Sequence, residues 1–426
     1  MEPDKKSENK KQMIRSLIRT GFFHIFSSSV INKMLTFLSN IVVVRFVSKI
    51  DYGVFAYADN MISMILLASG MGMVSGTFQL CSEKKDNREK NEIFRYGTAV
   101  GIRINIVLCL VIAFISQFLP FKFDSAGEYL FLMSINPILM IIFEFQQIYF
   151  RSRMENQKFS FASTFNTFLV VMGAIFGVII ASIDGMIIGR NIAYILTIII
   201  VSVKLAAPVY IKKTNIDKKE KIELFKISFI SMLNNGISHL LYLLDVFLLG
   251  LILSSEQIIA SYKVATTIPT AMIFIPTALV TYIYPYFASK KDDKHWCLRQ
   301  YKRIIKYFGS FNLLVTIGLI LLAKPIIILL YGTQYIDAVT CFRILAINYF
   351  ISGTFRTISG NLLITQRRLG FNLMANIISG SINIIGNVIL IPLCASGGAA
   401  LTTLTASFVA AVMSTGLYIY ILKKEN

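Results

Sequence analysis

Apolar stretches of about twenty residues recur along almost the whole chain, and each is long enough to cross the hydrocarbon core of a bilayer as a helix. Hydrophobic residues make up 55% of the 426 positions and charged residues 15%. The mean hydropathy of +0.66 is too high for a soluble protein of this length. The pattern predicts an all-α polytopic membrane protein with about twelve transmembrane helices. We place them at 22–46, 54–78, 97–119, 129–150, 161–182, 186–205, 227–252, 262–288, 304–323, 338–363, 371–391 and 397–422.

The positive charges follow the same periodicity as the apolar stretches. Lys and Arg number 42 against 23 Asp and Glu, which gives a formal net charge of +19. The cations gather in every second loop, as the positive-inside rule requires of an even number of spans with both termini cytoplasmic. The basic segments are 5–19, 84–95, 151–158, 204–226, 290–306, 367–368 and 423–424. We therefore expect a membrane protein whose basic face lies toward anionic lipids of the cytoplasmic leaflet, and no nucleic-acid partner.

The segments between the spans carry no sign of catalysis. They are short, and they hold no phosphate-binding loop, metalloprotease motif or nucleophile elbow. The five cysteines lack C-x-x-C spacing, which favours reduced thiols over disulfides or a metal site. The charged start leads into an apolar run without a cleavage site, so we expect no cleaved signal peptide. Many helices with little outside the membrane favour a transporter, with no catalytic residue, metal or cofactor.

The first and seventh predicted spans each gather polar side chains on one face. At 100° per residue the shared faces comprise Ser29, Asn32, Lys33, Thr36, Ser39 and Asn40 in the first span and Ser231, Asn235, Ser238, His239, Tyr242 and Asp245 in the seventh. This recurrence predicts two six-helix bundles related as parallel repeats. The predicted parts are a basic N-terminal segment at 1–21, an N-terminal bundle at 22–205, a linker at 206–226, a C-terminal bundle at 227–422 and a tail at 423–426.

Further polar stripes run along the tenth and eleventh predicted spans. They comprise Asn348, Ser352, Arg356 and Ser359 in the tenth and Asn372, Asn376, Ser379, Asn383 and Asn387 in the eleventh. We expect these faces to line one wet central cavity, because unpaired polar groups are costly in lipid. The substrate-binding residues expected in it are Lys33, Asn40, Asn235, His239, Tyr242 and Arg356.

Charged residues within the spans need a partner or water, because each costs roughly 2.5–3.5 kcal/mol at the bilayer centre. Depth along the chain predicts two structural ion pairs, Arg103 with Glu144 and Arg343 with Asp245. Asp59, Glu144 and Asp245 are candidates for ion coupling or charge balance. A cavity with more cations than carboxylates favours an anionic solute, since Lys and Arg bind phosphate well. A polar lumen suits sugars.

Four stretches, in this order and spacing, resemble the bacterial polysaccharide flippases. The stretches are VVRFVSKIDYGVFAYA at 43–58, LLDVFLLGLILSSEQIIASYKVA at 243–265, KPIIILLYGTQYIDAVTCFRIL at 324–345 and GGAALTT at 397–403. These flippases form the Wzx-type branch of the multidrug/oligosaccharidyl-lipid/polysaccharide exporter (MOP) superfamily. Ala260 and Ala395 depart from the family pattern, which often has glycine at both positions.

The resemblance implies the fold of the multidrug MATE transporters, in which two six-helix bundles form a V that alternates between inward-open and outward-open states. It implies a substrate as well, an undecaprenyl-diphosphate-linked oligosaccharide moved to the outer leaflet. There it would be used to make the O-antigen of lipopolysaccharide, a capsule or a similar polymer. A polysaccharide polymerase and a chain-length regulator are implied partners. Cation coupling occurs in the superfamily.

Two other functions remain open at this point. A cation-coupled multidrug antiporter has the same fold, although surplus Lys and Arg in the cavity would repel cationic drugs. A polytopic polysaccharide polymerase would need a substantial outer loop with catalytic residues, and the predicted outer links are short.

Overall fold

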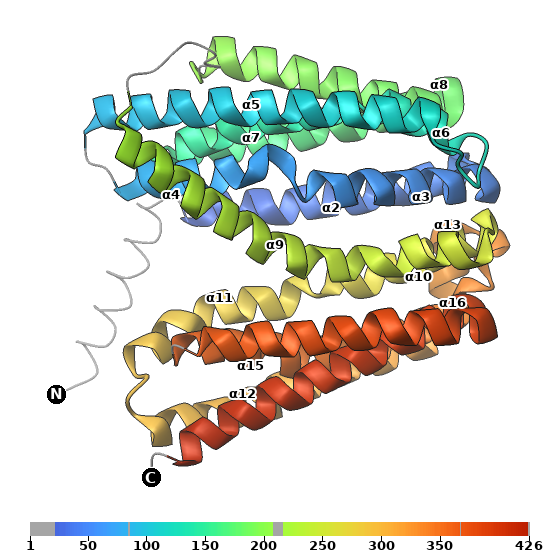
Figure 1. The fold of residues 1–426 in the computed structure, drawn as a ribbon. Helices are drawn as coiled ribbons and strands as arrows, with labels where there is room; N and C mark the ends of the chain where they lie inside the picture. Colours follow the sequence, from blue (N-terminus) through green and yellow to red (C-terminus); the bar gives the residue numbers. More distant parts are fainter. Residues whose placement is uncertain (1–21, 84–85, 208–215, 367, 425–426) are drawn as a thin grey trace. The chain divides into compact units, whose positions relative to one another are not determined.

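The computed structural model describes residues 22–83, 86–207, 216–366 and 368–424, and within these ranges it contains helices and no strand (Figure 1). The helices of the N-terminal part are α2 (Phe22–Phe46), α3 (Lys49–Leu66), η1 (Ser69–Gly72), α4 (Met73–Glu83), α5 (Asn87–Phe118), α6 (Ala126–Met133), α7 (Asn136–Ser152), α8 (Asn156–Lys204) and α9 (Lys218–Leu253). Those of the C-terminal part are α10 (Glu256–Met272), α11 (Phe274–Ser289), α12 (Lys294–Leu321), α13 (Ala323–Tyr331), η2 (Thr333–Tyr335), α14 (Ala338–Ile351), η3 (Ser352–Arg356), α15 (Thr357–Thr365) and α16 (Leu369–Lys424).

The predicted membrane spans are confirmed. Nine helical segments of the described chain are long and apolar enough to cross a bilayer. Two of them, in α8 and α16, run over 49 and 55 residues, which is more than twice the roughly 20 residues that one crossing needs. Each of these folds back on itself and counts as two spans. Together with the shorter apolar helix Leu243–Leu253, they account for all the predicted spans.

The two hairpins turn through the same backbone conformation. In α8, Ser182 has φ 51° and ψ −135°; in α16, Ala395 has φ 48° and ψ −131°. The glycine three residues later lies against a backbone carbonyl of the opposite arm, Gly185 on Gly177 and Gly398 on Leu390, where a side chain has no room. Gly173 likewise lies on Gly189, because small residues permit close helix packing in lipid.

The turn in α16 carries avoidable backbone strain. A positive φ costs an L-residue with a Cβ roughly 1–2 kcal/mol, and Ala395 adopts φ 48°. We predict that Ala395→Gly raises the free energy of unfolding by about 1 kcal/mol, because glycine avoids this strain. Thermal unfolding in detergent measures the effect. Ala410→Gly, at a buried helical position of the same hairpin, lowers stability instead, and a decrease for Ala395→Gly as well would contradict the prediction.

The described residues form two compact units. The first takes in residues up to Val47 and Met61–Leu240; the second takes in Ser48–Asn60 and the residues from Leu241 onward. These bounds differ from the predicted boundary in the 206–226 linker. The first half of α9 belongs to the first unit because Gly72 and Gly76 lie directly against Ser228. Sequence position alone does not reveal such a contact.

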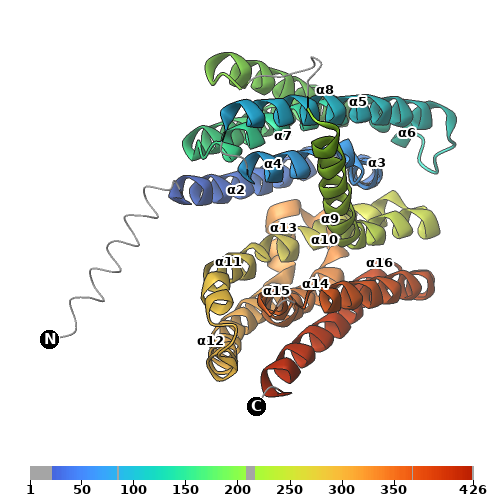
Figure 2. The same ribbon diagram turned by 60° about the vertical axis from the view of Figure 1, so that its left-hand side comes forward.

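Within the first unit, α8 packs against α2 and α7, and α5 packs against α4 and α7 (Figure 1). Within the second, α14 packs against α10 and α16, and α15 packs against α11 and α16 (Figure 2). Both units carry many exposed apolar side chains, as helices facing lipid do.

A buried asparagine holds the interrupted helices of the first unit together. Asn105 of α5 accepts a 2.6 Å hydrogen bond from the backbone N–H of Gly70, where the second span breaks with φ 53°. Its amide nitrogen donates to Pro137 O at 2.6 Å and to Ser69 Oγ at 3.0 Å. One side chain therefore bonds the backbone N–H at the break and also joins this break to the start of α7.

In the second unit a buried asparagine likewise joins neighbouring helices, here through side-chain partners. Asn312 of α12 accepts a 2.9 Å hydrogen bond from Tyr349 Oη and donates to Thr354 Oγ1 at 3.0 Å. Thr354 lies in η3, a π-helical turn. Asn105 and Asn312 stand at the same interval in the sequence as Ser48 and Ser255, each of which directly precedes a helix. This correspondence supports the predicted parallel repeat.

Candidate functional site

Asp245 of α9 is the centre of a buried polar cluster in the second unit. Its side chain is 5% exposed and accepts hydrogen bonds from Tyr262 Oη at 2.7 Å, Asn387 Nδ2 at 2.8 Å and Asn383 Nδ2 at 3.1 Å, and also from Thr403 Oγ1. The donors come from α10 and from both arms of α16. Asp245 lies eight residues from the end of α9 at Leu253, about 12 Å along the helix axis. A carboxylate at such depth needs partners of this kind.

The donor set of this cluster also fits a monovalent cation. All four partners of Asp245 are neutral, so nothing in the cluster balances the carboxylate charge. Oδ1 of Asn387 is buried without a hydrogen-bond partner. Rotation of the side-chain amide of Asn383 or Asn387 would turn its oxygen toward the carboxylate. The orientation of such an amide follows the surrounding hydrogen-bond network. The cluster can therefore take up a proton, or a hard cation on carboxylate, amide and hydroxyl oxygens.

The polar stripe on the first arm of α16 is a packing seam, which corrects the prediction that it lines a wet cavity. Ser379, Asn383 and Asn387 are at most 5% exposed. Besides the bonds to Asp245, Ser379 donates to Ala406 O at 3.0 Å, and Asn372 donates to Gly360 O at 2.6 Å. Polar side chains that hydrogen-bond across helices are common in lipid. A polar stripe in a sequence is compatible with either role.

Arg356 lies at the end of the π-helical turn η3 (Ser352–Arg356). It is half-buried, and its Nη2 donates to Asn376 Oδ1 at 3.1 Å. The wider π-turn changes the direction of the residues after it, and such turns occur often at functional sites. Ser359, predicted to share the face of Arg356, instead bonds Tyr301 and Thr415 within 3.0 Å. No salt bridge between described residues involves Arg356.

The segment Ser48–Asn60 is tied to the rest of the second unit by two charge pairs. Lys49 Nζ lies 2.8 Å from Asp337 and also donates to Gln334 O at 2.9 Å. Asp337 accepts a further 2.7 Å hydrogen bond from Ser261. Asp59 lies 4.0 Å from Lys263, with both side chains about one-third exposed. The nearby cation makes charge balance the simpler role for Asp59.

The two predicted ion pairs are not among the salt bridges that the described residues form. Arg103 is exposed, and Glu144 is half-buried on α7. Arg343 is exposed and donates from Nε to Ile320 O at 3.3 Å, while Asp245 bonds only neutral groups. Similar depth in the membrane does not ensure that two side chains point toward each other.

The remaining predicted cavity residues are distributed along α2 and α9. Lys33 and His239 are exposed and Asn40 is half-buried. The side chains of Asn235 and Tyr242 lie outside those that the structure describes. The first span is anchored beside Lys33 by Asn32, which donates to Ser163 Oγ of α8 at 2.9 Å.

Sequence reasoning missed two partners of Asp245, namely Tyr262 and Thr403. Both lie in stretches that carry the resemblance to flippases, at the entry to α10 and after GGAA, but nothing in the spacing links them to a carboxylate elsewhere. The i, i+4 spacing of Asn383 and Asn387 was the available signal, since it places two amides on one helix face.

Comparisons with known proteins concern the fold as a whole. The structure is similar to that of the lipid II flippase MurJ in an inward closed conformation, with a TM-score of 0.75 at 15% identity over 94% of this chain and 87% of that one. It is also similar to an inward-facing multidrug resistance MATE family transporter of the MOP superfamily, with a TM-score of 0.75 at 12% identity over 92% and 95% of the two chains. A MOP superfamily transporter from Pyrococcus furiosus matches with a TM-score of 0.65 at 12% identity over 94% and 95%.

Similarity at these identities concerns the fold alone. No curated protein matches the sequence significantly. The family model described as "Polysaccharide biosynthesis protein" matches residues 42–340, which is well over half of the chain. The chain therefore belongs to the polysaccharide biosynthesis protein family, as a multi-pass membrane protein with the fold of the MOP superfamily transporters.

Proposed function

We propose that this protein is a flippase that moves undecaprenyl-diphosphate-linked oligosaccharides from the cytoplasmic to the outer leaflet of the bacterial cytoplasmic membrane. Family membership and the fold support a transporter of lipid-linked substrates in polysaccharide biosynthesis. The two units alternate in access, both termini are cytoplasmic, and the product supplies O-antigen, capsule or a similar polymer. A polysaccharide polymerase and a chain-length regulator would act on it next.

The observation that carries the substrate class is the environment of Arg356. It lies nine residues before the end of α15 at Thr365, about 14 Å from that helix end and thus near the middle of a bilayer. Its bond to Asn376 is made to a neutral amide. The guanidinium keeps its full charge and further N–H donors, which suits the bidentate binding of a phosphate. Lys33, Asn40, Asn235, His239 and Tyr242 complete the proposed substrate-binding surface.

Asp245 is the proposed coupling site. A cation or proton on the carboxylate would neutralise the buried charge and change the hydrogen bonds that join α9, α10 and both arms of α16. Binding can bias a transporter between its states only if the affinity differs between them. The ligands of this site come from separate helices, so a shift of the two arms of α16 would separate them. The affinity for the cation would then differ between the two states. Glu144, half-buried on α7, is a second candidate for coupling in the first unit.

A cation-coupled multidrug antiporter is the alternative, favoured by the similarity to MATE transporters. The same Asp245 cluster would serve it. A charged Arg356 with a neutral partner would however repel a cationic drug. Normal lipid-linked intermediates together with raised drug sensitivity, in cells lacking the protein, would support this alternative.

The Arg356 proposal predicts that Arg356→Met lowers the rate of flipping in proteoliposomes about tenfold or more, through loss of a charge-assisted contact to the diphosphate. Arg356→Lys restores part of the rate, because the charge remains while the bidentate geometry is lost. Arg343→Met is the matched control, since it removes an exposed arginine from the same membrane span. Equal rates for Arg356→Met and Arg343→Met would exclude Arg356 from substrate binding.

A further inference from the structure

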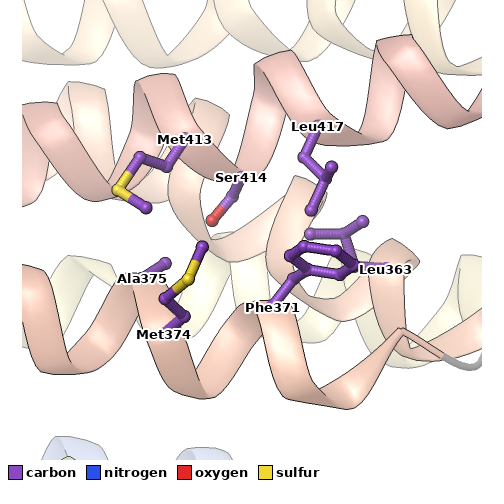
Figure 3. Close-up of a pocket in the computed structure, with 7 residues that line it drawn as sticks. All are labelled: Leu363, Phe371, Met374, Ala375, Met413, Ser414 and Leu417. Carbon is purple, nitrogen blue, oxygen red and sulfur yellow. The ribbon is translucent and has the colours of Figure 1, made fainter.

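A small apolar cavity lies within the second unit, between α15 and the two arms of α16 (Figure 3). Its volume is about 180 Å³. Its lining consists of Leu363, Phe371, Met374, Ala375, Met413, Ser414 and Leu417, and Ser414 is the only polar residue among them. An apolar cavity of about 150 Å³ stays dry and binds benzene. This cavity therefore suits an apolar group a little larger than benzene.

One wall of the cavity is open. Phe371 is 39% exposed and Met374 is 46% exposed, whereas Ala375 on the same wall is 4% exposed. Figure 3 shows the two methionine side chains, from opposite arms of α16, on one side of the cavity and Phe371 with Leu417 on the other. Methionine adapts to irregular apolar ligands. A chain in the membrane can thus enter sideways.

The cavity lies beside the basic end of the unit. Leu363 is two residues from the end of α15, and its carbonyl accepts a 3.1 Å hydrogen bond from Arg368 N–H. Leu417 is about two turns from Lys424, where α16 ends with two lysines. By the positive-inside rule this end is cytoplasmic. A lipid in the cytoplasmic leaflet with its phosphate at these cations would place the first carbons of its tail at the depth of the cavity.

We infer that the cavity binds the first one or two isoprene units of a polyprenyl phosphate lipid in the cytoplasmic leaflet, while Arg368 and the terminal lysines hold its phosphate. This inference rests on the proposed function and specifies how the lipid part of the substrate is recognised. Isoprene is branched and short enough to fill the volume, and a filled cavity regains the van der Waals contacts that an empty one loses. Lipid tails are as apolar as the cavity, so polarity does not favour one chain over another. The selectivity for isoprene over ordinary acyl chains therefore comes from the fit of its shape.

Lipid binding to the full-length protein, measured by native mass spectrometry, tests the inference. The probes are undecaprenyl phosphate and, as an anionic lipid with linear chains, phosphatidylglycerol. Ser414→Leu and Ala375→Leu each fill the cavity, and both are expected to weaken undecaprenyl phosphate binding about tenfold without changing phosphatidylglycerol binding. Geranyl phosphate, with two isoprene units, should compete with undecaprenyl phosphate on the wild-type protein.

Ser381→Leu is the matched control, because Ser381 is an exposed residue on the first arm of α16 outside the cavity. It should leave both affinities unchanged, and thermal unfolding without lipid confirms that each variant is folded. Wild-type affinity in both filled variants would overturn the inference while leaving the proposed function intact. Equal losses of affinity for both lipids would show that they bind only as non-specific lipid around the protein, which would also overturn the inference. A wild-type protein that neither prefers undecaprenyl phosphate nor flips lipid-linked oligosaccharide would overturn both.

Discussion

Asp245→Asn is expected to abolish the dependence of transport on a cation gradient and to lower the rate of flipping by about a hundredfold. The carboxylate receives four hydrogen bonds from neutral donors, and the substitution replaces one of its acceptor oxygens by an amide that is itself a donor. Hydrogen bonds to a charged group contribute about 1.5–3 kcal/mol each, and about 3 kcal/mol in an activation free energy corresponds to roughly a hundredfold in rate. Flipping in proteoliposomes, with imposed sodium or proton gradients, measures the effect.

The matched control for this substitution is Asp124→Asn, at an exposed carboxylate between α5 and α6. It should leave both the rate and the gradient dependence unchanged. Because Asp245→Asn also costs buried hydrogen bonds, its thermal unfolding is measured alongside. A folded Asp245→Asn protein that responds to a gradient as the wild type does would remove Asp245 from coupling and leave it a structural role.

Asn105→Ala is expected to lower the free energy of unfolding by about 3–5 kcal/mol. The side chain is fully buried and is the partner of Gly70 N–H and Pro137 O, both at 2.6 Å. Its loss leaves buried backbone groups without that partner at about 1–3 kcal/mol each and opens a void between three spans. Thermal unfolding of the purified protein in detergent measures the loss.

Asn87→Ala provides the comparison, since Asn87 is exposed in the first turn of the same helix α5. We expect less than about 1 kcal/mol there. A small effect of Asn105→Ala, similar to that of Asn87→Ala, would mean that water replaces the amide and that the break in the second span does not depend on it.

Much of the fold follows from the sequence because hydrophobicity and charge alternation act on whole segments. The spans, including the two pairs that form the hairpins in α8 and α16, derive from the length and apolar content of their segments. The division of α3 and α9 between the units could not be derived in this way. It depends on contacts between distant residues, such as Ser228 with Gly72 and Gly76.

The candidate site was predictable only in part. A lone carboxylate in an apolar span identified Asp245, and its cost in lipid required a partner. Depth suggested Arg343 as that partner, but helix rotation decides which side chains meet, and neutral donors from α10 and α16 surround Asp245 instead. The role of the Asn383 and Asn387 stripe as a seam likewise depends on which helix lies opposite. Arg356 was identified from its charge, whereas the π-turn before it left no clear signal.

The leaflet on which lipid-linked oligosaccharides accumulate, in cells that lack this protein, tests the proposed function most directly. Mass spectrometry identifies the lipids, and their accessibility to a membrane-impermeant reagent assigns the leaflet. We predict single undecaprenyl-diphosphate-linked repeat units on the cytoplasmic face and loss of the surface polymer, both reversed by the wild-type protein and not by Arg356→Met. Repeat units on the outer face, or normal lipid intermediates, would contradict the flippase proposal.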